Sequence, residues 1–172
     1  MQIRLSLQEV FKKFYFQTNM ETMSNEIELV KNQINITYQV VLMNIEEITH
    51  EESMIFPNGE ANCMNWVLGH LIYVRNGLLN MLGEAPVWDG ETFSGYNRGA
   101  SALERKDEFI NFEKLKSYLE QSQNKLEAKL ASLEHFQPEQ VKDMATLCFH
   151  ENYHSGQLGY IRRLVGKPGA IK

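Results

Sequence analysis

The sequence contains little cysteine, no long hydrophobic run and no cluster of basic residues. Only two cysteines occur in 172 residues, Cys63 and Cys148, and neither belongs to a C-x-x-C pattern. We therefore expect a reduced, cytoplasmic protein in which both are small buried hydrophobic residues and not metal ligands. The net charge is -5, and basic residues gather only in short pairs such as Lys12-Lys13. This balance argues against nucleic acid as a partner.

No stretch of about 18 apolar residues is present, as a membrane-spanning helix would require. The most apolar segment, residues 63–83, contains Asn65, His70, Arg75 and Asn76, which indicates a buried amphipathic helix. Residues 1–22 contain charged residues and no clean apolar core, which argues against a cleavable signal peptide. We therefore expect no association with a membrane.

Four stretches carry apolar residues or histidines at steps of three and four, the spacing of helices with one buried face. The first has Ser24 or Asn25 as a candidate cap. The inward positions are Ile27, Val30, Ile34, Tyr38, Val41, Ile45 and Ile48; Cys63, Trp66, Val67, His70, Val74, Leu78 and Met81; Phe112, Leu115, Leu119, Leu126, Leu130 and Leu133; and Met144, Leu147, His150, His154, Leu158, Ile161, Leu164 and Val165.

Four helices of this length predict an all-α protein built as a four-helix bundle. The chain length favours one domain with a hydrophobic core. We assign the bundle to residues 23–172 and treat residues 1–22 as an N-terminal extension. Residues typical of helix starts and ends mark the predicted boundaries: Gly83, Asn111, Pro138 and Gly166.

One connection between the predicted helices is long. Residues 84–110 contain several turn-forming pairs, including Asp89-Gly90 and Ser94-Gly95. A loop of this length in a compact domain is usually functional or disordered. Three aromatic residues, Trp88, Phe93 and Tyr96, indicate that part of it packs against the bundle. We interpret the segment as a lid over a pocket.

Three histidines are predicted to point inward. His150 and His154 lie four residues apart on the apolar stripe of the fourth helix, and His70 lies on that of the second. A buried polar group without a hydrogen bond costs about 1–3 kcal/mol. A divalent metal ion shared by the three imidazoles would satisfy them and leave coordination positions open, and the alternative is hydrogen-bonded core histidines. We expect His50 and His135 to be ordinary surface residues.

Residues 150–154 match the H-E-x-x-H pattern of zinc proteases. After His154 the sequence contains no Asp, Glu, His or Cys, so no downstream third ligand exists and a protease of that type is rejected. Two E-x-x-H elements also match part of a di-iron bundle site. That site is rejected because the second helix, residues 61–83, contains no carboxylate.

Glu151 lies one residue beyond His150, which rotates it by about 100° around the helix. Three roles are open to it: a general base beside the metal, a hydrogen-bond partner of a ligand histidine, or a residue that faces a neighbouring helix or subunit. Tyr153 and Gln157 flank the same face and either line a pocket or pack between helices.

Three segments resemble the DinB-like family of metalloenzymes. "HENYHSGQLGYIRRLVGKPG", residues 150–169, resembles its C-terminal helix, and "NWVLGHLIYVRNGLL", residues 65–79, resembles its second helix. "FSGYNRGAS", residues 93–101, is similar to the loop before its third helix. The resemblance covers about residues 24–169. It implies an up-down-down-up four-helix bundle, often a homodimer, with a divalent metal held by His70, His150 and His154.

The activity of the family is implied more broadly than its fold. Some members resemble metal-dependent transferases that use a low-molecular-weight thiol, and others are tied to isomerase or hydrolase chemistry. We therefore expect a metal-dependent transferase or hydrolase that acts on a small molecule, with zinc or nickel as first candidates and iron, manganese or cobalt as others. The alternative is a non-catalytic metal-binding or scaffold bundle that acts as a dimer.

Overall fold

A computed structural model describes residues 25–59, 61–88, 93–99 and 101–171. In these ranges the protein is helical and forms no strand. The long helices are α2 (Asn25–Ile45), α4 (Met64–Met81), α5 (Phe112–Ala131) and α6 (Pro138–Leu164). Short elements occupy the connections: α3 (His50–Ser53), η1 (Pro57–Gly59), η2 (Ser94–Tyr96) and η3 (Lys106–Glu108). The all-α prediction is confirmed, whereas residues 1–22, Ser24 and the turn at Asp89-Gly90 lie outside the described residues.

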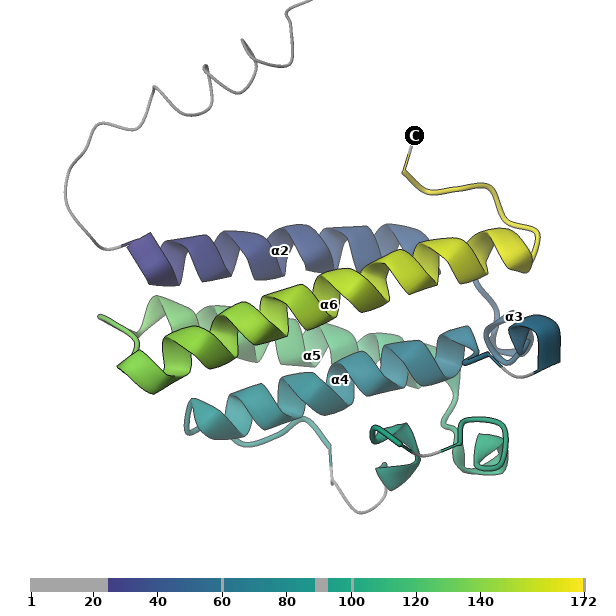
Figure 1. Ribbon diagram of the computed structural model, residues 1–172, viewed down its shortest axis with the longest axis horizontal. Helices are drawn as coiled ribbons and strands as arrows, with labels where there is room; N and C mark the ends of the chain where they lie inside the picture. Colours follow the sequence, from purple (N-terminus) through teal and green to yellow (C-terminus); the bar gives the residue numbers. More distant parts are fainter. Residues whose placement is uncertain (1–24, 60, 89–92, 100, 172) are drawn as a thin grey trace, which may run out of the picture.

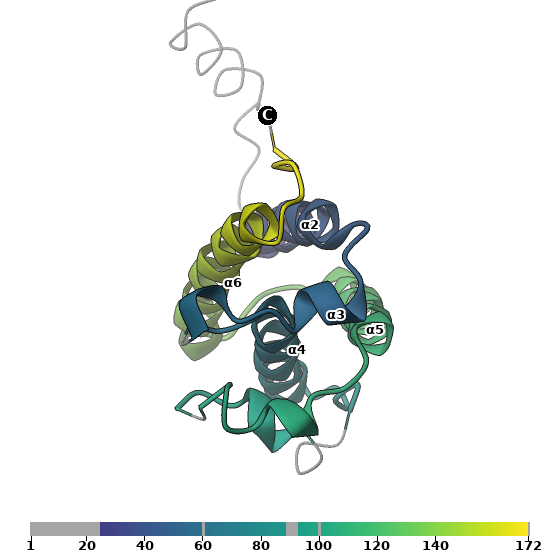
Figure 2. The same cartoon turned by 90° about the vertical axis from the view of Figure 1, so that its right-hand side faces the viewer.

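The four long helices form a bundle with the up-down-down-up order. In Figure 1, α2 runs in one direction, α4 and α5 both run in the opposite direction, and α6 runs with α2. The helices pack in a ring, because α2 contacts α6 and α5, and α4 contacts the same two helices. Figure 2 shows this ring from its end. The connection between α4 and α5 returns along the bundle, which allows both helices to run the same way.

The helix ends follow the local chemistry that the sequence predicts. The side chain of Asn111 accepts a hydrogen bond of 2.9 Å from the backbone N–H of Glu113 and caps α5. Pro138 occupies the first position of α6, where its missing N–H costs nothing. Gly83 and Gly166 follow α4 and α6 with φ values of 79° and 86°, a conformation that favours glycine. The predicted starts and stops at these positions are confirmed.

The helix α4 is buried on nearly all sides. Its polar residues Asn65, Arg75 and Asn76 are each 5% exposed or less. The outer side of α4 is covered by the connection that follows it, because Phe93 and Tyr96 pack into the same core cluster as residues of α4. In the described residues, no helix combines the length and apolar character that crossing a membrane would need.

Candidate metal centre

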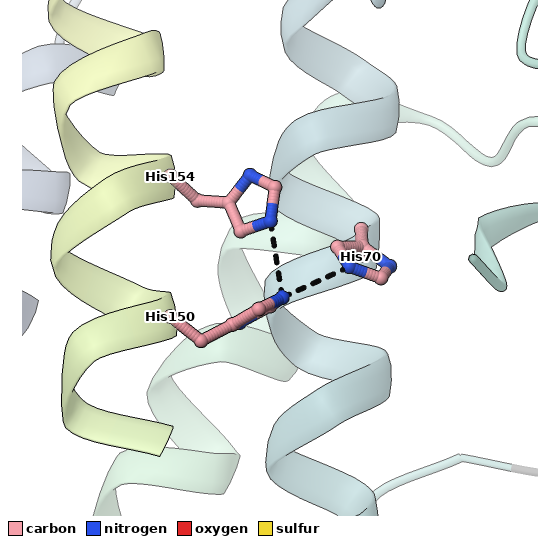
Figure 3. Close-up of side chains that lie close together, drawn as sticks. All are labelled: His70, His150 and His154. Atoms are coloured by element: carbon pink, nitrogen blue, oxygen red, sulfur yellow. Dashed lines mark hydrogen bonds between the residues drawn. The ribbon is translucent and has the colours of Figure 1, made fainter. Parts of the chain in front are cut away.

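His70 on α4 and His150 and His154 on α6 meet between the two helices (Figure 3). The Nε2 atom of His150 lies 3.2 Å from Nε2 of His70 and 3.1 Å from Nε2 of His154. Two imidazole nitrogens bound to one tetrahedral zinc ion lie about 3.4 Å apart, given bonds of about 2.0–2.1 Å. The three histidines, whose ligand atoms all lie within 4.8 Å of one another, are therefore close enough to hold a metal ion.

The ring of His70 is held in a single orientation. Its Nδ1 lies 2.7 Å from the backbone carbonyl oxygen of Tyr96. A carbonyl only accepts hydrogen bonds, so Nδ1 carries the hydrogen and Nε2 presents its lone pair to the other histidines. The indole ring of Trp66 stacks on His70 with 4.7 Å between centroids, and its Nε1–H donates to the carbonyl of Gly95 at 3.1 Å. Both contacts fix the imidazole as a metal ligand would require.

Gly69 allows the connection to approach α4 at this point. A Cβ atom on Gly69 would lie 2.2 Å from the ring of Tyr96, a distance that no side chain tolerates. The Tyr96 hydroxyl donates to Oδ1 of Asn65 at 3.0 Å and accepts from the backbone N–H of Ile110 at 2.9 Å. The aromatic part of the connection thus packs down as predicted and supports His70, and its role as a lid stays a prediction.

His154 has the same arrangement as His70. Its Nδ1 donates to Oε1 of Gln157 at 2.7 Å, and Nε2 of Gln157 donates in turn to the hydroxyl oxygen of Tyr153 at 3.2 Å. The Nε2 of His154 therefore also presents a lone pair. His150 lies between two acceptors, and its own Nδ1 is buried and has no hydrogen-bond partner among the described residues. The one hydrogen that Nε2 of His150 can carry cannot bond well to the lone pairs of both His70 and His154. A cation, by contrast, binds all three Nε2 atoms.

The electrostatic environment keeps the imidazoles neutral, which is the form that binds metals. Burial lowers the pKa of His154 to about 4, and the neighbouring His150 lowers it as well. Burial also lowers the pKa of His70 and of His150. The exposed guanidinium of Arg98 contributes to the lowered pKa of both His70 and His150. The three imidazoles are therefore mostly in the neutral form at neutral pH, and the charge of Arg98 favours that form for two of them.

Glu151 faces a neighbouring helix and is bound there by Arg75. The Nε and Nη2 atoms of Arg75 lie 2.6 and 3.0 Å from the two carboxylate oxygens, and the two side chains are 1% and 2% exposed. This contact agrees with the third of the roles left open by the sequence. Our sequence reasoning gave Arg75 no role at the site, although a single charged residue in the segment 63–83 was a usable signal.

The remaining histidines and the cysteines lie outside the cluster. His50 begins α3 and is half-buried, because α3 packs against α4 and α5, so the expectation of an ordinary surface residue is wrong for it. His135 is exposed as predicted. Cys63 is buried and Cys148 half-buried, both are free thiols, and burial raises the pKa of each to about 11. Cys63 fits the prediction of a small buried residue, whereas Cys148 is only half-buried.

No protein-family model matches the chain, and no curated protein gives a significant match. The resemblance to the DinB-like family therefore stays a prediction, and the fold and the histidine cluster stand on the geometry alone.

Proposed function

We propose that the protein is a DinB-like enzyme that depends on a divalent metal and acts on a small molecule by thiol S-transfer or hydrolysis. The observation that carries the proposal is the convergence of three Nε2 atoms from His70, His150 and His154. Oxygen acceptors on the second nitrogens of His70 and His154 support it, because they are the usual outer partners of metal-binding histidines.

The donor set suits zinc or nickel, with iron, manganese or cobalt as further candidates. Structural zinc sites usually have four protein ligands, whereas catalytic sites have three and keep a position open. His70, His150 and His154 form a set of three. A bound divalent ion would lower the pKa of a thiol or a water molecule and so supply a nucleophile near neutral pH.

Residues around the histidines support the binding of a small substrate. The phenol oxygen of Tyr153 accepts from Gln157, so its own hydrogen is available to a substrate. Tyr153 is 58% exposed, and its ring meets that of His154 edge-on at 5.1 Å. The positive charge of Arg98 lowers the pKa of His70 and of His150. The same charge favours an anionic substrate such as a thiolate or a carboxylate.

Metal analysis of purified protein tests the centre. We expect one divalent ion per chain, bound in competition with a chelator, and loss of that ion in His70→Ala and in His154→Ala. The exposed His135→Ala is the matched control and should keep its metal. Stoichiometric metal that survives both substitutions in the cluster would contradict the proposal.

Turnover tests the reaction class. The metal-loaded protein should conjugate a low-molecular-weight thiol to an electrophile or hydrolyse a small ester or amide. Removal of the metal should abolish the activity, and zinc or nickel should restore it. Metal-loaded protein that turns over none of these substrates, and whose metal has no position accessible to an added ligand such as azide, would favour a non-catalytic role.

A non-catalytic scaffold that acts as a homodimer is the second candidate, and the outer face of α2 and α6 favours it. Most of the exposed large apolar side chains of the described residues lie on these two helices: Leu29, Ile36, Met43, Phe149, Tyr153, Tyr160 and Leu164. A hollow of 390 Å³ lies between the same helices and the C-terminal segment. Exposed apolar surface of this kind marks interaction sites. Sedimentation analysis of Tyr160→Ser beside the unmodified protein measures whether this face holds a dimer.

The proposed location is the cytoplasm. Cys63 and Cys148 are both free and at least half-buried, which suits a compartment that keeps thiols reduced. The negative net charge of -5 leaves nucleic acid outside the proposed partners.

A further inference from the structure

Arg75 on α4 contacts each of the other three long helices. Its Nε and Nη2 atoms bind both carboxylate oxygens of Glu151 on α6. Its Nη1 lies 3.0 Å from Oε1 of Gln123 and 3.4 Å from the hydroxyl of Ser122, both on α5. The ring of Tyr38 on α2 lies 5.8 Å from the guanidinium carbon. A charged side chain thus forms the centre of a bundle whose core is otherwise mostly apolar.

The stability of the bundle does not by itself explain this pair. Removing two charges from water costs about as much free energy as their attraction returns, so buried ion pairs are often no better than apolar residues of similar size. The pair instead restricts how the two side chains can lie relative to each other. A guanidinium and a carboxylate joined by two parallel hydrogen bonds accept one relative placement, whereas apolar side chains tolerate a range of packings.

The pair joins the same two helices that supply the three histidines. Arg75 follows His70 by five residues on α4, a distance of about 7.5 Å along the axis. Glu151 follows His150 directly on α6. In the described residues no hydrogen bond joins Glu151 to a histidine. Both of its oxygens accept from Arg75, and Nδ1 of His150 has no partner among these residues. Burial lowers the pKa of His150, whereas the negative charge of Glu151 raises it. The contacts of the pair with each other act on the centre through the placement of the helices.

We propose that the Arg75–Glu151 ion pair is a positioning device for the metal centre. It sets the axial register of α4 against α6 and thereby holds Nε2 of His70 opposite His150 and His154. Metal–ligand distances tolerate deviations of only about 0.2 Å, so a small slide of one helix would separate the ligands. The inference rests on the proposed metal-binding function.

The test replaces the pair by apolar residues of similar size, Arg75→Met with Glu151→Leu. Because such a replacement is often neutral or stabilising, the metal-free variant should unfold at the same temperature as the unmodified protein or higher. Its zinc affinity, measured by competition with a chelator, should fall about ten- to a hundredfold, as for loss of the outer partners of metal ligands. The absorption spectrum of bound Co²⁺, which reports coordination geometry, should change.

A second ion pair provides the matched control. Lys129 and Glu84 also join two segments, with 3.4 Å between Nζ and Oε1, but lie at the surface and away from the histidines. Replacing them by Met and Leu should leave the zinc affinity and the Co²⁺ spectrum unchanged. The conservative substitution Arg75→Lys keeps the charge and loses the two parallel hydrogen bonds. We expect an intermediate zinc affinity for this variant. It provides the test if the apolar variant fails to fold.

The outcomes separate the inference from the function on which it rests. If the unmodified protein binds no metal, both the proposed metal-binding function and the positioning role are wrong. Metal binding by the unmodified protein together with unchanged affinity and spectrum in the folded apolar variant would overturn the positioning role and leave the centre intact. If only the Arg75→Lys variant folds, unchanged zinc affinity and an unchanged Co²⁺ spectrum in that variant would overturn the positioning role. A weakened site in a stable variant would establish the role.

Discussion

The backbone carbonyl oxygen of Tyr96 lies 2.7 Å from Nδ1 of His70, 26 residues earlier in the chain. The long connection after α4 thus fixes the tautomer of a candidate metal ligand. The contact depends on Gly69, which leaves room for the Tyr96 ring, and on Asn65, which binds the Tyr96 hydroxyl. The connection and the metal centre are therefore one structural unit.

Gly69→Ala should damage this unit. The added Cβ would meet the Tyr96 ring at 2.2 Å, so the connection must shift and the carbonyl must leave His70. We expect a loss of about 1–3 kcal/mol in the free energy of unfolding and weaker zinc binding, measured by urea unfolding and chelator competition. Gly77→Ala on the same helix meets nothing within 4 Å and should gain about 0.5–1 kcal/mol. Equal behaviour of the two variants would refute the role of Gly69.

Gln157→Leu should weaken the metal centre with little effect on folding. The side chain of Gln157 accepts from Nδ1 of His154, and without it the imidazole loses the partner that fixes its tautomer. We expect zinc affinity to fall about 10–100-fold in a chelator competition. Gln121→Leu, which removes a surface amide bound to Ser117 on α5, should leave the affinity unchanged. An unaltered affinity in Gln157→Leu would show that this hydrogen bond is not needed.

The metal-free protein should lose stability as the pH falls from about 6.5 to about 4. The lower limit is the pKa of His154 in the folded protein, and the upper limit is its ordinary value of 6.5. Between these values the unfolded chain binds a proton that the folded chain does not, so the free energy of unfolding decreases with decreasing pH. Urea unfolding across this range, with a chelator present, measures the slope.

The carboxyl groups also titrate in this range, so variants must isolate the histidine. His154→Gln should flatten the pH dependence of the free energy of unfolding, whereas His135→Gln, at an exposed position, should leave it unchanged. A slope that is identical in His154→Gln and in the unmodified protein would contradict the lowered pKa.

Both cysteines should be unreactive in the folded protein. Cys63 is 0% exposed, and burial raises the pKa of its thiol, and of the Cys148 thiol, to about 11. At pH 8 few molecules carry a reactive thiolate. A chromogenic disulfide reagent should therefore label neither residue quickly until urea is added, and Cys148→Ser assigns any label that appears. Rapid labelling of two thiols in the native protein would show that this burial is wrong.

Periodicity was sufficient to predict the four long helices and the inward histidines. Residues four apart lie on one face of a helix whatever it packs against, so His150 and His154 share a face by local geometry alone. The starts of α5 and α6 follow from Asn111 and Pro138, whose effects are also local. His70 was placed on an inward stripe, but its distance from the other two histidines depends on how two helices align.

The sequence by itself determined the four long helices and most of their inward positions, because these depend on neighbours within about one turn. Leu164, which the pattern placed inward, is 47% exposed. Only the tertiary structure decided that Arg75 binds Glu151 and that the carbonyl of Tyr96 meets His70. Such contacts join residues that are distant in the chain. They depend on how α4 lies against α6 and on the path of a long connection, and neighbours in the sequence fix neither of these.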